Sequence, residues 1–533
     1  MASKRTRSDA FLAASNHWNK KPKPHKEEEK EAKPKDVPEV INISSDDESI
    51  TEIKPKSSPI KLFYNPSYHE NLKSKVNKDC IKITDIVGSP ELTETYQFNF
   101  NVDLPYFLKF LDKSFINKRK PITFITGSQL LDPSFEETSE IKSKFNISEV
   151  IASLPNRYAS HHTKMMINFY GDDLEVVIMS ANITQIDFIG LTQMVWRSEK
   201  LKKGKTTTTR GKKFQNDLIA YLKTYKKSNI TSLASILKDY DFSSVTVELI
   251  ASSPGKYDID KDEEIYGYGK LYKTLQEHDL LLNNTDKSKK YNILAQTSAI
   301  SYPISIEKWS TGGILSHLIC PLIFGKNNFK LLEPSGSSFK NHQHQHNYTP
   351  SIVFPTVDEV ANSNVGYWSG QALHFNYTQS FIHKNYYTQN LKPYLKRWGS
   401  HQLITGREKV MPHVKIYTID NGDNFNTLKW VYMGSHNLSK QAWGSRKGNK
   451  FTNADPREYE LSSYELGVLI IPEKDEVIKP VYMKDTIDEV GVLPVRFPFR
   501  VPLTSYSNDD LPWSGKVDYG DKEDSQGMKY NLG

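Results

Sequence analysis

Two regions of the chain differ in how hydrophobic and polar residues alternate. Residues 1 to about 58 show no apolar periodicity: they carry 12 Lys/Arg and 11 Asp/Glu, with Phe11 and Trp18 as their only aromatic residues. Such a composition cannot bury enough apolar surface to build a core. The pattern predicts a disordered N-terminal tail over residues 1–60.

From about residue 80 onward, short apolar runs alternate with amphipathic segments. Runs of β-forming residues predict strands, and segments with helical periodicity predict helices between them. The predicted strands are 122–126, 175–179, 245–251, 430–433 and 466–471, and the predicted helices include 214–225 and 266–281. Strands that alternate with helices are typical of α/β layers. The turn residues 252–255 mark the best boundary between two halves, 80–255 and 256–533.

Composition narrows the class of protein. The chain has 533 residues and a net charge of +7, which is compatible with a nucleic-acid partner but does not require one. Its two cysteines, Cys80 and Cys320, exclude a disulfide scaffold and are too few for a cysteine-rich zinc site. The most apolar stretch, 314–324, is far shorter than the roughly 20 residues that a membrane span needs. We expect a soluble intracellular protein without membrane contact.

One segment of the globular part is strongly basic. Residues 197–213 carry eight Lys/Arg against a single acid, Glu199. This charge pattern predicts a flexible, positively charged surface loop.

The tail contains one apolar island. Val40–Ile43, followed by the acidic residues up to Glu48, resembles a SUMO-interacting motif, which adds a strand to the edge of a partner's sheet. The alternative is a chance run of apolar residues in a tail. Basic clusters at 4–7 and 20–26 are compatible with a nuclear address, although such runs are often only solvated charge.

Two short patterns recur 251 residues apart and carry the candidate chemistry. They are His162-Thr163-Lys164 and His413-Val414-Lys415, and each is followed by a strand-like run that ends near an Asn. These are Asn182, 20 residues after His162, and Asn437, 24 residues after His413. In a strand, side chains at i and i+2 point to the same face, so each His projects together with its Lys. The repetition predicts a duplicated unit whose halves share one site.

Two His, two Lys and two Asn include no carboxylate pair that would hold a metal. They do provide a nucleophile, a general acid and cationic clamps for phosphate oxygens. Such preorganised donors stabilise the charge that develops on a five-coordinate phosphorus. For either pair alone a buried core His and a solvated strand Lys are the better interpretation, but both pairs together favour catalysis.

These motifs resemble the phospholipase D superfamily, and within it the tyrosyl-DNA phosphodiesterase family, with a fungal-type member as the expectation. The resemblance spans about residues 80–520. It rests on the segments 158–166, 411–417, 435–444, 463–469 and 511–513. It implies an α/β fold of two similar phospholipase-D-like α-β-α sandwich domains, related by a pseudo-twofold axis and preceded by the disordered tail.

The sequence departs from the wider superfamily in two ways. The superfamily carries an Asp after four further residues beyond each His-x-Lys, where this chain has Phe169 in the first motif and Asp420 in the second. We interpret Asp420 as incidental to the chemistry. Ser180-Ala181 also stands where the superfamily has Gly-Ser, which disfavours a lipid-directed phospholipase.

The resemblance implies a role for each motif residue. His162 would be the nucleophile, forming a phosphohistidine with a 3′-phosphotyrosyl substrate, and His413 would protonate the leaving tyrosyl oxygen and then activate water. The non-bridging oxygens would be held by Lys164, Lys415, Asn182 and Asn437. No cofactor or metal is implied.

Each histidine needs an orienting partner on its other ring nitrogen. Glu465 opens the apolar run 466–471, where a carboxylate needs a buried partner to be tolerated, and the resemblance pairs it with His162. The alternative for Glu465 is a strand-end carboxylate that faces water. Gln193 would orient His413 in the same way.

The resemblance also implies contacts to the substrate. Tyr158 would stack on a base, or else be a core tyrosine. Ser298, Ser439 and Lys440 would contact the DNA backbone, and Trp513 would line the side that receives tyrosine or peptide.

The resulting hypothesis is a nuclear DNA-repair phosphodiesterase. It would act on single-stranded or nicked DNA that carries a 3′-linked tyrosine or a topoisomerase I-derived peptide, without metal and as a monomer. Two alternatives stay open: a phospholipase-D-type nuclease or lipase, and a catalytically weak scaffold recruited through residues 40–48.

Overall fold

The computed structural model describes residues 56–532 except 132–133, 135, 283–287, 302–342, 345, 401 and 447–456. Lys54–Gly533 form one compact unit. The predicted tail up to residue 55, the Val40–Glu48 motif, the two basic clusters and Cys320 lie outside the described residues.

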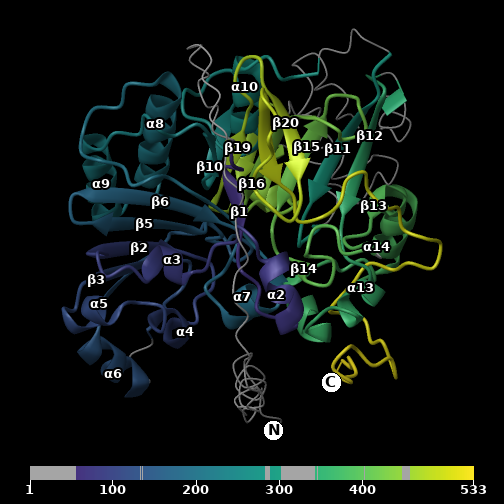
Figure 1. The fold of residues 1–533 in the computed structure, drawn as a ribbon, viewed down its shortest axis with the longest axis horizontal. Coiled ribbons are helices and arrows are strands. Elements are labelled where there is room, and N and C mark those ends of the chain that lie inside the picture. The colour runs from purple at the N-terminus through teal and green to yellow at the C-terminus, as the bar shows by residue number, and fades with distance from the viewer. Residues whose placement is uncertain are drawn as a thin grey trace, which may run out of the picture. The chain divides into compact units, whose positions relative to one another are not determined.

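A seven-stranded mixed sheet with helices on both faces forms the first half of this unit (Figure 1). Its strand order is β1-β8-β6-β5-β2-β3-β4. The strands are β1 (Ile60–Leu62), β2 (Glu94–Phe98), β3 (Pro121–Thr126), β4 (Asn146–Ile151), β5 (Met165–Tyr170), β6 (Asp173–Met179) and β8 (Met194–Arg197). The helices are α3 (Thr84–Val87), α4 (Leu104–Leu108), α5 (Lys113–Asn117), α6 (Glu136–Lys144), α8 (Thr209–Lys223), α9 (Ser228–Ile236) and the 3-10 turn η1 (Leu237–Asp239). Helix α2 (Glu70–Val76) instead packs through Val76 against Val410 of the second half.

This sheet is buried on both faces, which explains why its central strands read as continuous apolar runs. Alternate residues of β5 point to opposite sides. Met165 and Ile167 pack in the cluster that contains residues of α8 and α9, whereas Met166 and Tyr170 pack with residues of α3, α4 and α5.

A nine-stranded sheet forms the second half. Seven of its strands follow the order β13-β12-β11-β15-β16-β19-β9, and β20 and β21 extend it from β16. The strands are β9 (Glu248–Ser252), β11 (Tyr291–Gln296), β12 (Tyr348–Val353), β13 (Leu395–Lys396), β15 (Ile416–Asp420), β16 (Leu428–Gly434), β19 (Glu465–Ile470), β20 (Val477–Val481) and β21 (Val492–Arg496). The helices are α10 (Tyr268–Glu277), α13 (Val357–Ala361), α14 (Phe381–Tyr386), the π turn η5 (Tyr387–Leu391) and the 3-10 turns η4 (Gly366–Ala372) and η6 (Lys392–Tyr394).

The two sheets share one plan. In the first, β3 is parallel to β2, and β2, β5, β6 and β8 follow one another antiparallel. In the second, β12 is parallel to β11, and β11, β15, β16 and β19 follow antiparallel in the same way. The expected α/β fold with two similar halves is therefore confirmed.

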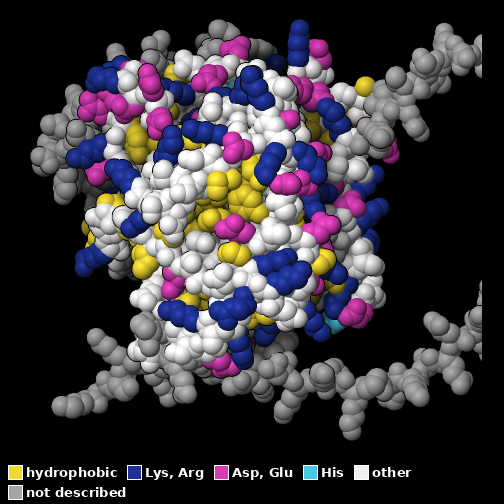
Figure 2. Space-filling view, turned by 90° about the vertical axis from the view of Figure 1, so that its left-hand side faces the viewer, with side chains coloured by type: hydrophobic (Ala, Val, Ile, Leu, Met, Phe, Trp, Pro, Cys, Tyr) yellow, Lys and Arg dark blue, Asp and Glu magenta, His cyan; other side chains and the backbone are white. Residues whose placement is uncertain are grey.

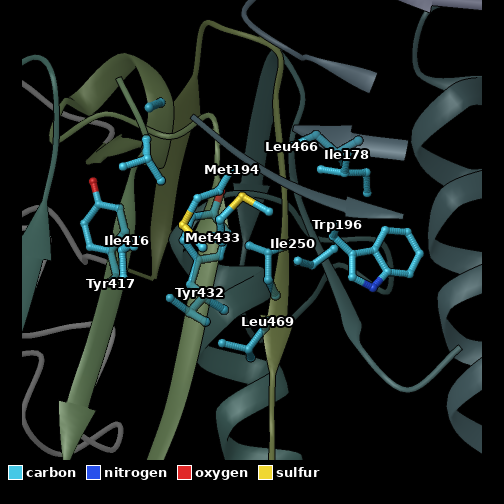
Figure 3. Packing of buried hydrophobic residues seen from close by; sticks show 14 of the residues in the cluster. Ile178, Met194, Trp196, Ile250, Ile416, Tyr417, Tyr432, Met433, Leu466 and Leu469 are labelled. Carbon is cyan, nitrogen blue, oxygen red and sulfur yellow. The ribbon is translucent and has the colours of Figure 1, made fainter. Parts of the chain in front are cut away.

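A continuous core joins the halves (Figure 3). Ile178, Met194 and Trp196 come from the first sheet and pack in the same buried cluster as Ile250 and Met433 from the second. Because the halves bury apolar surface against each other, a site between them has a rigid support on both sides.

Further short elements lie outside the two large sheets, and among them the pairing of β7 with β14 joins the two halves. They are α7 (Gln185–Ile189), α15 (Lys440–Trp443), the parallel pair β7 (Leu191–Thr192) and β14 (Met411–Pro412), and the small sheet of β10 (Gly255–Asp258), β17 (Ser445–Arg446) and β18 (Glu458–Leu461).

The predicted strands 122–126, 175–179, 430–433 and 466–471 coincide with β3, β6, β16 and β19, and the predicted helices with α8 and α10. The division of the chain at residue 255 stays a prediction. The strand before it, β9, pairs with β19 of the second sheet, although the sequence places it in the first half.

The basic segment 197–213 is not simply a positively charged loop. It begins in β8 and ends in α8, and Lys200, Lys202 and Lys203 form ion pairs with Glu91, Asp173 and Asp172. These acids come from distant parts of the sequence. On the face shown in Figure 2, Lys and Arg side chains accordingly lie among Asp and Glu side chains.

Candidate active site

The two His-x-Lys motifs occupy equivalent positions, each directly before a central antiparallel strand, β5 or β15. Each motif also bonds to the opposite half. The His162 backbone N–H donates to the carbonyl of Tyr464 at 2.9 Å, and the His413 N–H donates to the carbonyl of Thr192 at 3.0 Å. This reciprocal exchange brings both motifs to one site between the halves.

The two lysines are fully buried and bent back onto their own motifs. Lys164 Nζ donates to the carbonyl of His162 at 2.9 Å, and Lys415 Nζ donates to the carbonyl of His413. Burial lowers the pKa of Lys164 to about 8, against the raising effect of Glu465 and Asp187. Burial and the neighbouring Lys164 hold the pKa of Lys415 well below its usual value. When protonated, two neighbouring buried lysines attract an anion strongly, because little solvent screens their charge.

The structure brings Glu465 to His162, as the resemblance implies. His162 Nδ1–H donates to Glu465 Oε2 at 2.7 Å, and Ser435 Oγ–H donates to the same oxygen at 2.5 Å. Ser435 Oγ in turn accepts from the backbone N–H of Leu466 at 2.9 Å. Glu465 is buried rather than facing water, and with Nδ1 occupied, Nε2 is the ring nitrogen of His162 that is left to meet a substrate.

Two side chains lie against Nδ1 of His413. One is the expected Gln193, whose Nε2 lies 3.1 Å away. The other is Asp187 in α7, whose Oδ1 lies 3.0 Å away and which sequence reasoning missed. A signal existed: Asp187 stands between Ile186 and Phe188, and a lone carboxylate in an apolar turn needs a buried partner.

Burial and the lysines depress the pKa of both imidazoles. Burial first, then Lys164 and Lys415, hold the pKa of His162 well below its usual value. Burial and Lys415 lower the pKa of His413 to about 3, and Asp187 opposes them. Both imidazoles are therefore neutral at neutral pH, and a neutral imidazole has a ring nitrogen that can act as a nucleophile or a base. His413 gains its proton more readily once an anionic phosphate offsets the lysines.

The two asparagines are held differently. Asn437 Oδ1 accepts from Thr297 Oγ1 at 3.0 Å, from the Ala299 N–H at 3.0 Å and from Ser298 Oγ at 3.2 Å. Three donors on the oxygen leave the amide nitrogen to face a substrate. Asn182 donates its backbone N–H to Asp187, and its buried Oδ1 has no hydrogen-bond partner among the described residues.

A pocket of about 350 Å³ opens beside His162, Asn437 and Glu465. Tyr158 is on its rim with 67% of its surface exposed, so it is not a core tyrosine. Residues to which the sequence assigned no role also line it: His374, Asn376, Gln379, His383, Gln441 and Ser463. Phe100 lies against His162, with the two ring centroids 5.3 Å apart.

The remaining predicted contact residues differ in position. Ser298 holds Asn437, and Ser439 lines the pocket while its Oγ caps α15 by accepting from the Ala442 N–H. Lys440, the next residue, is exposed. Trp513 is fully buried, and its indole N–H donates to the Gly370 carbonyl at 2.8 Å, so the expected peptide contact by Trp513 is not supported.

Three polar residues near the motifs are structural. His161 and His436 are fully buried, hydrogen-bonded through both ring nitrogens, and burial lowers the pKa of each to about 4. Asp420 accepts from Asn292 and from the backbone of the turn after β15, which agrees with its being incidental to the chemistry.

Within the described part of the chain, no group of three or more His, Cys, Asp or Glu is placed to hold a metal ion. Among the same residues, no helix is both long and apolar enough to cross a bilayer.

Comparison with known proteins matches this arrangement to one family. The model of the family described as "Tyrosyl-DNA phosphodiesterase" matches residues 60–507. The chain belongs to the tyrosyl-DNA phosphodiesterase family. This match confirms the resemblance that the segments around the two His-x-Lys motifs indicated.

Its relatives include fungal and animal proteins. It is 27% identical over 532 residues to the probable tyrosyl-DNA phosphodiesterase of Schizosaccharomyces pombe, covering 85% of this chain and 92% of the relative. It is 28% identical over 445 residues to tyrosyl-DNA phosphodiesterase 1 of Drosophila melanogaster, covering 79% and 68%. The crystal structure of the yeast tyrosyl-DNA phosphodiesterase superposes with a TM-score of 0.65 at 24% identity, over 85% of this chain and 98% of that one. That likeness supports the fold of this family member.

Proposed function

We propose that the protein is a DNA-repair phosphodiesterase that hydrolyses the bond between a 3′-phosphate of DNA and a tyrosine, through a phosphohistidine intermediate. The observation that carries this proposal is the pair of histidines with carboxylate-held Nδ1 atoms beside two buried lysines. Membership of the tyrosyl-DNA phosphodiesterase family supplies the class of substrate.

In the first step, Nε2 of His162 attacks phosphorus, the N–P bond forms and the P–O bond to tyrosine breaks. His413, protonated on Nε2, gives that proton to the tyrosyl oxygen, so tyrosine leaves as the neutral phenol. Glu465 accepts the Nδ1–H of His162 throughout and stabilises the positive charge that the ring gains.

In the second step, His413 acts as a base. It takes a proton from a water molecule whose oxygen attacks phosphorus, the N–P bond breaks, and the products are a DNA 3′-phosphate and free His162. The change of role between acid and base requires that His413 keep its Nδ1 proton in both steps.

Charge on the phosphoryl oxygens is balanced by side chains. Lys164 and Lys415 supply buried positive charge, and the amide of Asn437, fixed through its oxygen, supplies a neutral donor. Asn182 completes the set by resemblance. These donors do at phosphorus what a metal ion does in other phosphodiesterases, so we propose that catalysis is metal-independent.

Further details extend this proposal. We propose that Tyr158, exposed at the pocket rim, stacks on a base of the strand, and that Ser439, which lines the pocket, and the exposed Lys440 contact its backbone. Topoisomerase I-derived peptide is the proposed blocking group. Because both motifs come from one chain, a monomer suffices for activity. SUMO binding through Val40–Glu48 and a nuclear location rest on the sequence alone.

The test is release of tyrosine from an oligonucleotide that carries 3′-phosphotyrosine, in excess EDTA. We expect full activity, and none from His162→Ala, which lacks the nucleophile. Parallel reactions use closed circular single-stranded DNA and phosphatidylcholine vesicles. Activity only on these would favour the nuclease or lipase alternative, and activity on none of the three would favour a scaffold.

A further inference from the structure

The two histidines are oriented by hydrogen-bonding chains that are equivalent at every position but one. In the second half, Leu466 N–H donates to Ser435 Oγ, Ser435 Oγ–H donates to Glu465, and Glu465 accepts from His162. In the first half, Met194 N–H donates to Ser180 Oγ and Ser180 Oγ–H donates to Oε1 of Gln193. Gln193 thus stands where its counterpart is a carboxylate.

The hydrogen bonds of the Gln193 side chain exclude it as the acceptor of the Nδ1 proton of His413. Its Oε1 is directed to Ser180 at 2.6 Å, and its Nε2 donates to Asp187 Oδ1 at 2.7 Å. A carboxylate can only accept, so the amide nitrogen must face Asp187 and therefore also His413. Acting alone, Gln193 would donate to Nδ1 and favour the tautomer with its proton on Nε2, which cannot later take a proton there from water.

Asp187 supplies the missing acceptor. Its Oδ1 lies 3.0 Å from His413 Nδ1 and accepts the backbone N–H of Asn182 at 2.9 Å, while Thr184 Oγ1–H donates to Oδ2 at 2.5 Å. Burial alone would raise the pKa of Asp187, but His413 and the hydrogen bonds from Thr184 and Asn182 bring it below its usual value, so the carboxylate stays ionised.

The residue types at equivalent positions of the two halves support this role of Asp187. Asp187 follows Asn182 by five residues, and the equivalent position after Asn437 is Ala442. The first half therefore has an amide at the orienting strand position and an acid in the helix turn, whereas the second half has Glu465 at the strand position and an alanine in the turn. Each half keeps one carboxylate for the opposite histidine.

We propose that Asp187 is the positioning residue that accepts the Nδ1 proton of His413 in both steps, and that Gln193 serves to orient Asp187. This inference rests on the proposed function. Asp187 then stabilises the imidazolium that protonates tyrosine, and it keeps Nε2 open as the base for water. It is buried and acts through His413.

Asp187→Asn tests the charge with little change in shape. An asparagine can still accept the Nδ1–H of His413 through its oxygen, but it no longer stabilises an imidazolium. We therefore expect the proton transfer to the leaving oxygen to fail first. The first step is measured in single turnover on two oligonucleotides, one with a 3′-phosphotyrosine and one with a 3′-(4-nitrophenyl) phosphate.

Tyrosine leaves slowly without a proton, whereas 4-nitrophenolate is a good leaving group. We expect Asp187→Asn to slow tyrosine release by about 100-fold or more, the usual range for general acid catalysis, and to slow 4-nitrophenol release at least tenfold less. Equal losses on both substrates, or no loss on the tyrosyl substrate, would overturn the proposal. No tyrosine release by the wild-type protein would instead overturn the proposed function.

Two further variants separate the role of Asp187 from folding. Asp420→Asn removes another fully buried carboxylate, one that binds only Asn292 and backbone groups of a turn, and should affect both substrates equally. Thr184→Val removes the hydrogen bond to Oδ2 without touching His413, and should reproduce the leaving-group dependence of Asp187→Asn in weaker form. A leaving-group dependence in Asp420→Asn, or its absence in Thr184→Val, would count against Asp187.

Discussion

At the scale of single residues, burial removes the water that would stabilise the charged form of each ionisable group in the site. Lys164 and Lys415 are fully buried, and the two histidines have lowered pKa values because water is excluded and the lysines are close. An anionic phosphate favours the charged forms of the lysines and of His413, because its negative charge stabilises those forms. We therefore expect substrate binding to favour protonation of His413, the acid of the first step, while His162 stays neutral as the nucleophile.

This linkage predicts an alkaline limit to substrate affinity. The pKa of Lys164 is lowered to about 8, so its positive charge is present below pH 8 and lost above it. Binding a phosphodiester should then take up protons and weaken by up to about tenfold per pH unit above 8. Calorimetry with an uncleavable 3′-phosphonate oligonucleotide, in buffers of different ionisation enthalpy, measures the uptake. Lys164→Arg stays charged at these pH values, so its binding should weaken much less above pH 8. The same weakening in this variant would assign the pH dependence to another group.

The two-step scheme predicts a trapped intermediate when the base is removed. His413→Ala leaves His162 and its partner Glu465 in place, so the N–P bond can still form, although more slowly because the leaving oxygen is no longer protonated. No group is then left to activate water. We expect hydrolysis of the intermediate to slow by about 100- to 10,000-fold, seen as DNA covalently linked to the protein on a denaturing gel. His162→Ala should give no such band. Turnover by His413→Ala at the wild-type rate would remove His413 from the second step.

At the scale of secondary structure, local sequence patterns predicted strands and helices but not which strands pair with one another. Apolar runs predicted β3, β6, β16 and β19 because both faces of each sheet are covered. That β9 pairs with β19 and β7 with β14 depends on contacts between residues far apart in the sequence, which no local pattern contains. The reciprocal backbone bonds from His162 to Tyr464 and from His413 to Thr192 are of the same kind.

The same distinction holds for the site. The repeat of His-x-Lys and Asn could be read directly, because strand periodicity places His and Lys on one face. Glu465 could be suspected from its apolar surroundings, whereas Gln193 required a known family. Asp187 escaped because it belongs to the five-residue helix α7, too short to show a periodic pattern. Trp513 shows the opposite error, since an aromatic residue near the end of the chain proved to be core.

At the scale of the whole molecule, the two halves behave as one body because their sheets share a hydrophobic core. Ile178, Met194 and Trp196 of the first half and Ile250 and Met433 of the second lie in one buried cluster (Figure 3). Each His-x-Lys motif donates a backbone hydrogen bond to the opposite half. A site assembled from both halves therefore requires that neither half unfold alone.

This arrangement predicts a single unfolding transition for the globular unit. Ile250 has no exposed surface, and Ile250→Ala should lower the free energy of unfolding by about 2–5 kcal/mol through lost transfer energy and a cavity. Because the core is shared, the loss should shift the whole transition in urea, followed both by far-UV circular dichroism and by tyrosine release. The matched control is Val490→Ala, at a position 76% exposed, which should change stability by less than about 0.5 kcal/mol. Two transitions, of which Ile250→Ala moves only one, would mean that the halves are stable separately and that the core between them does not couple the two motifs.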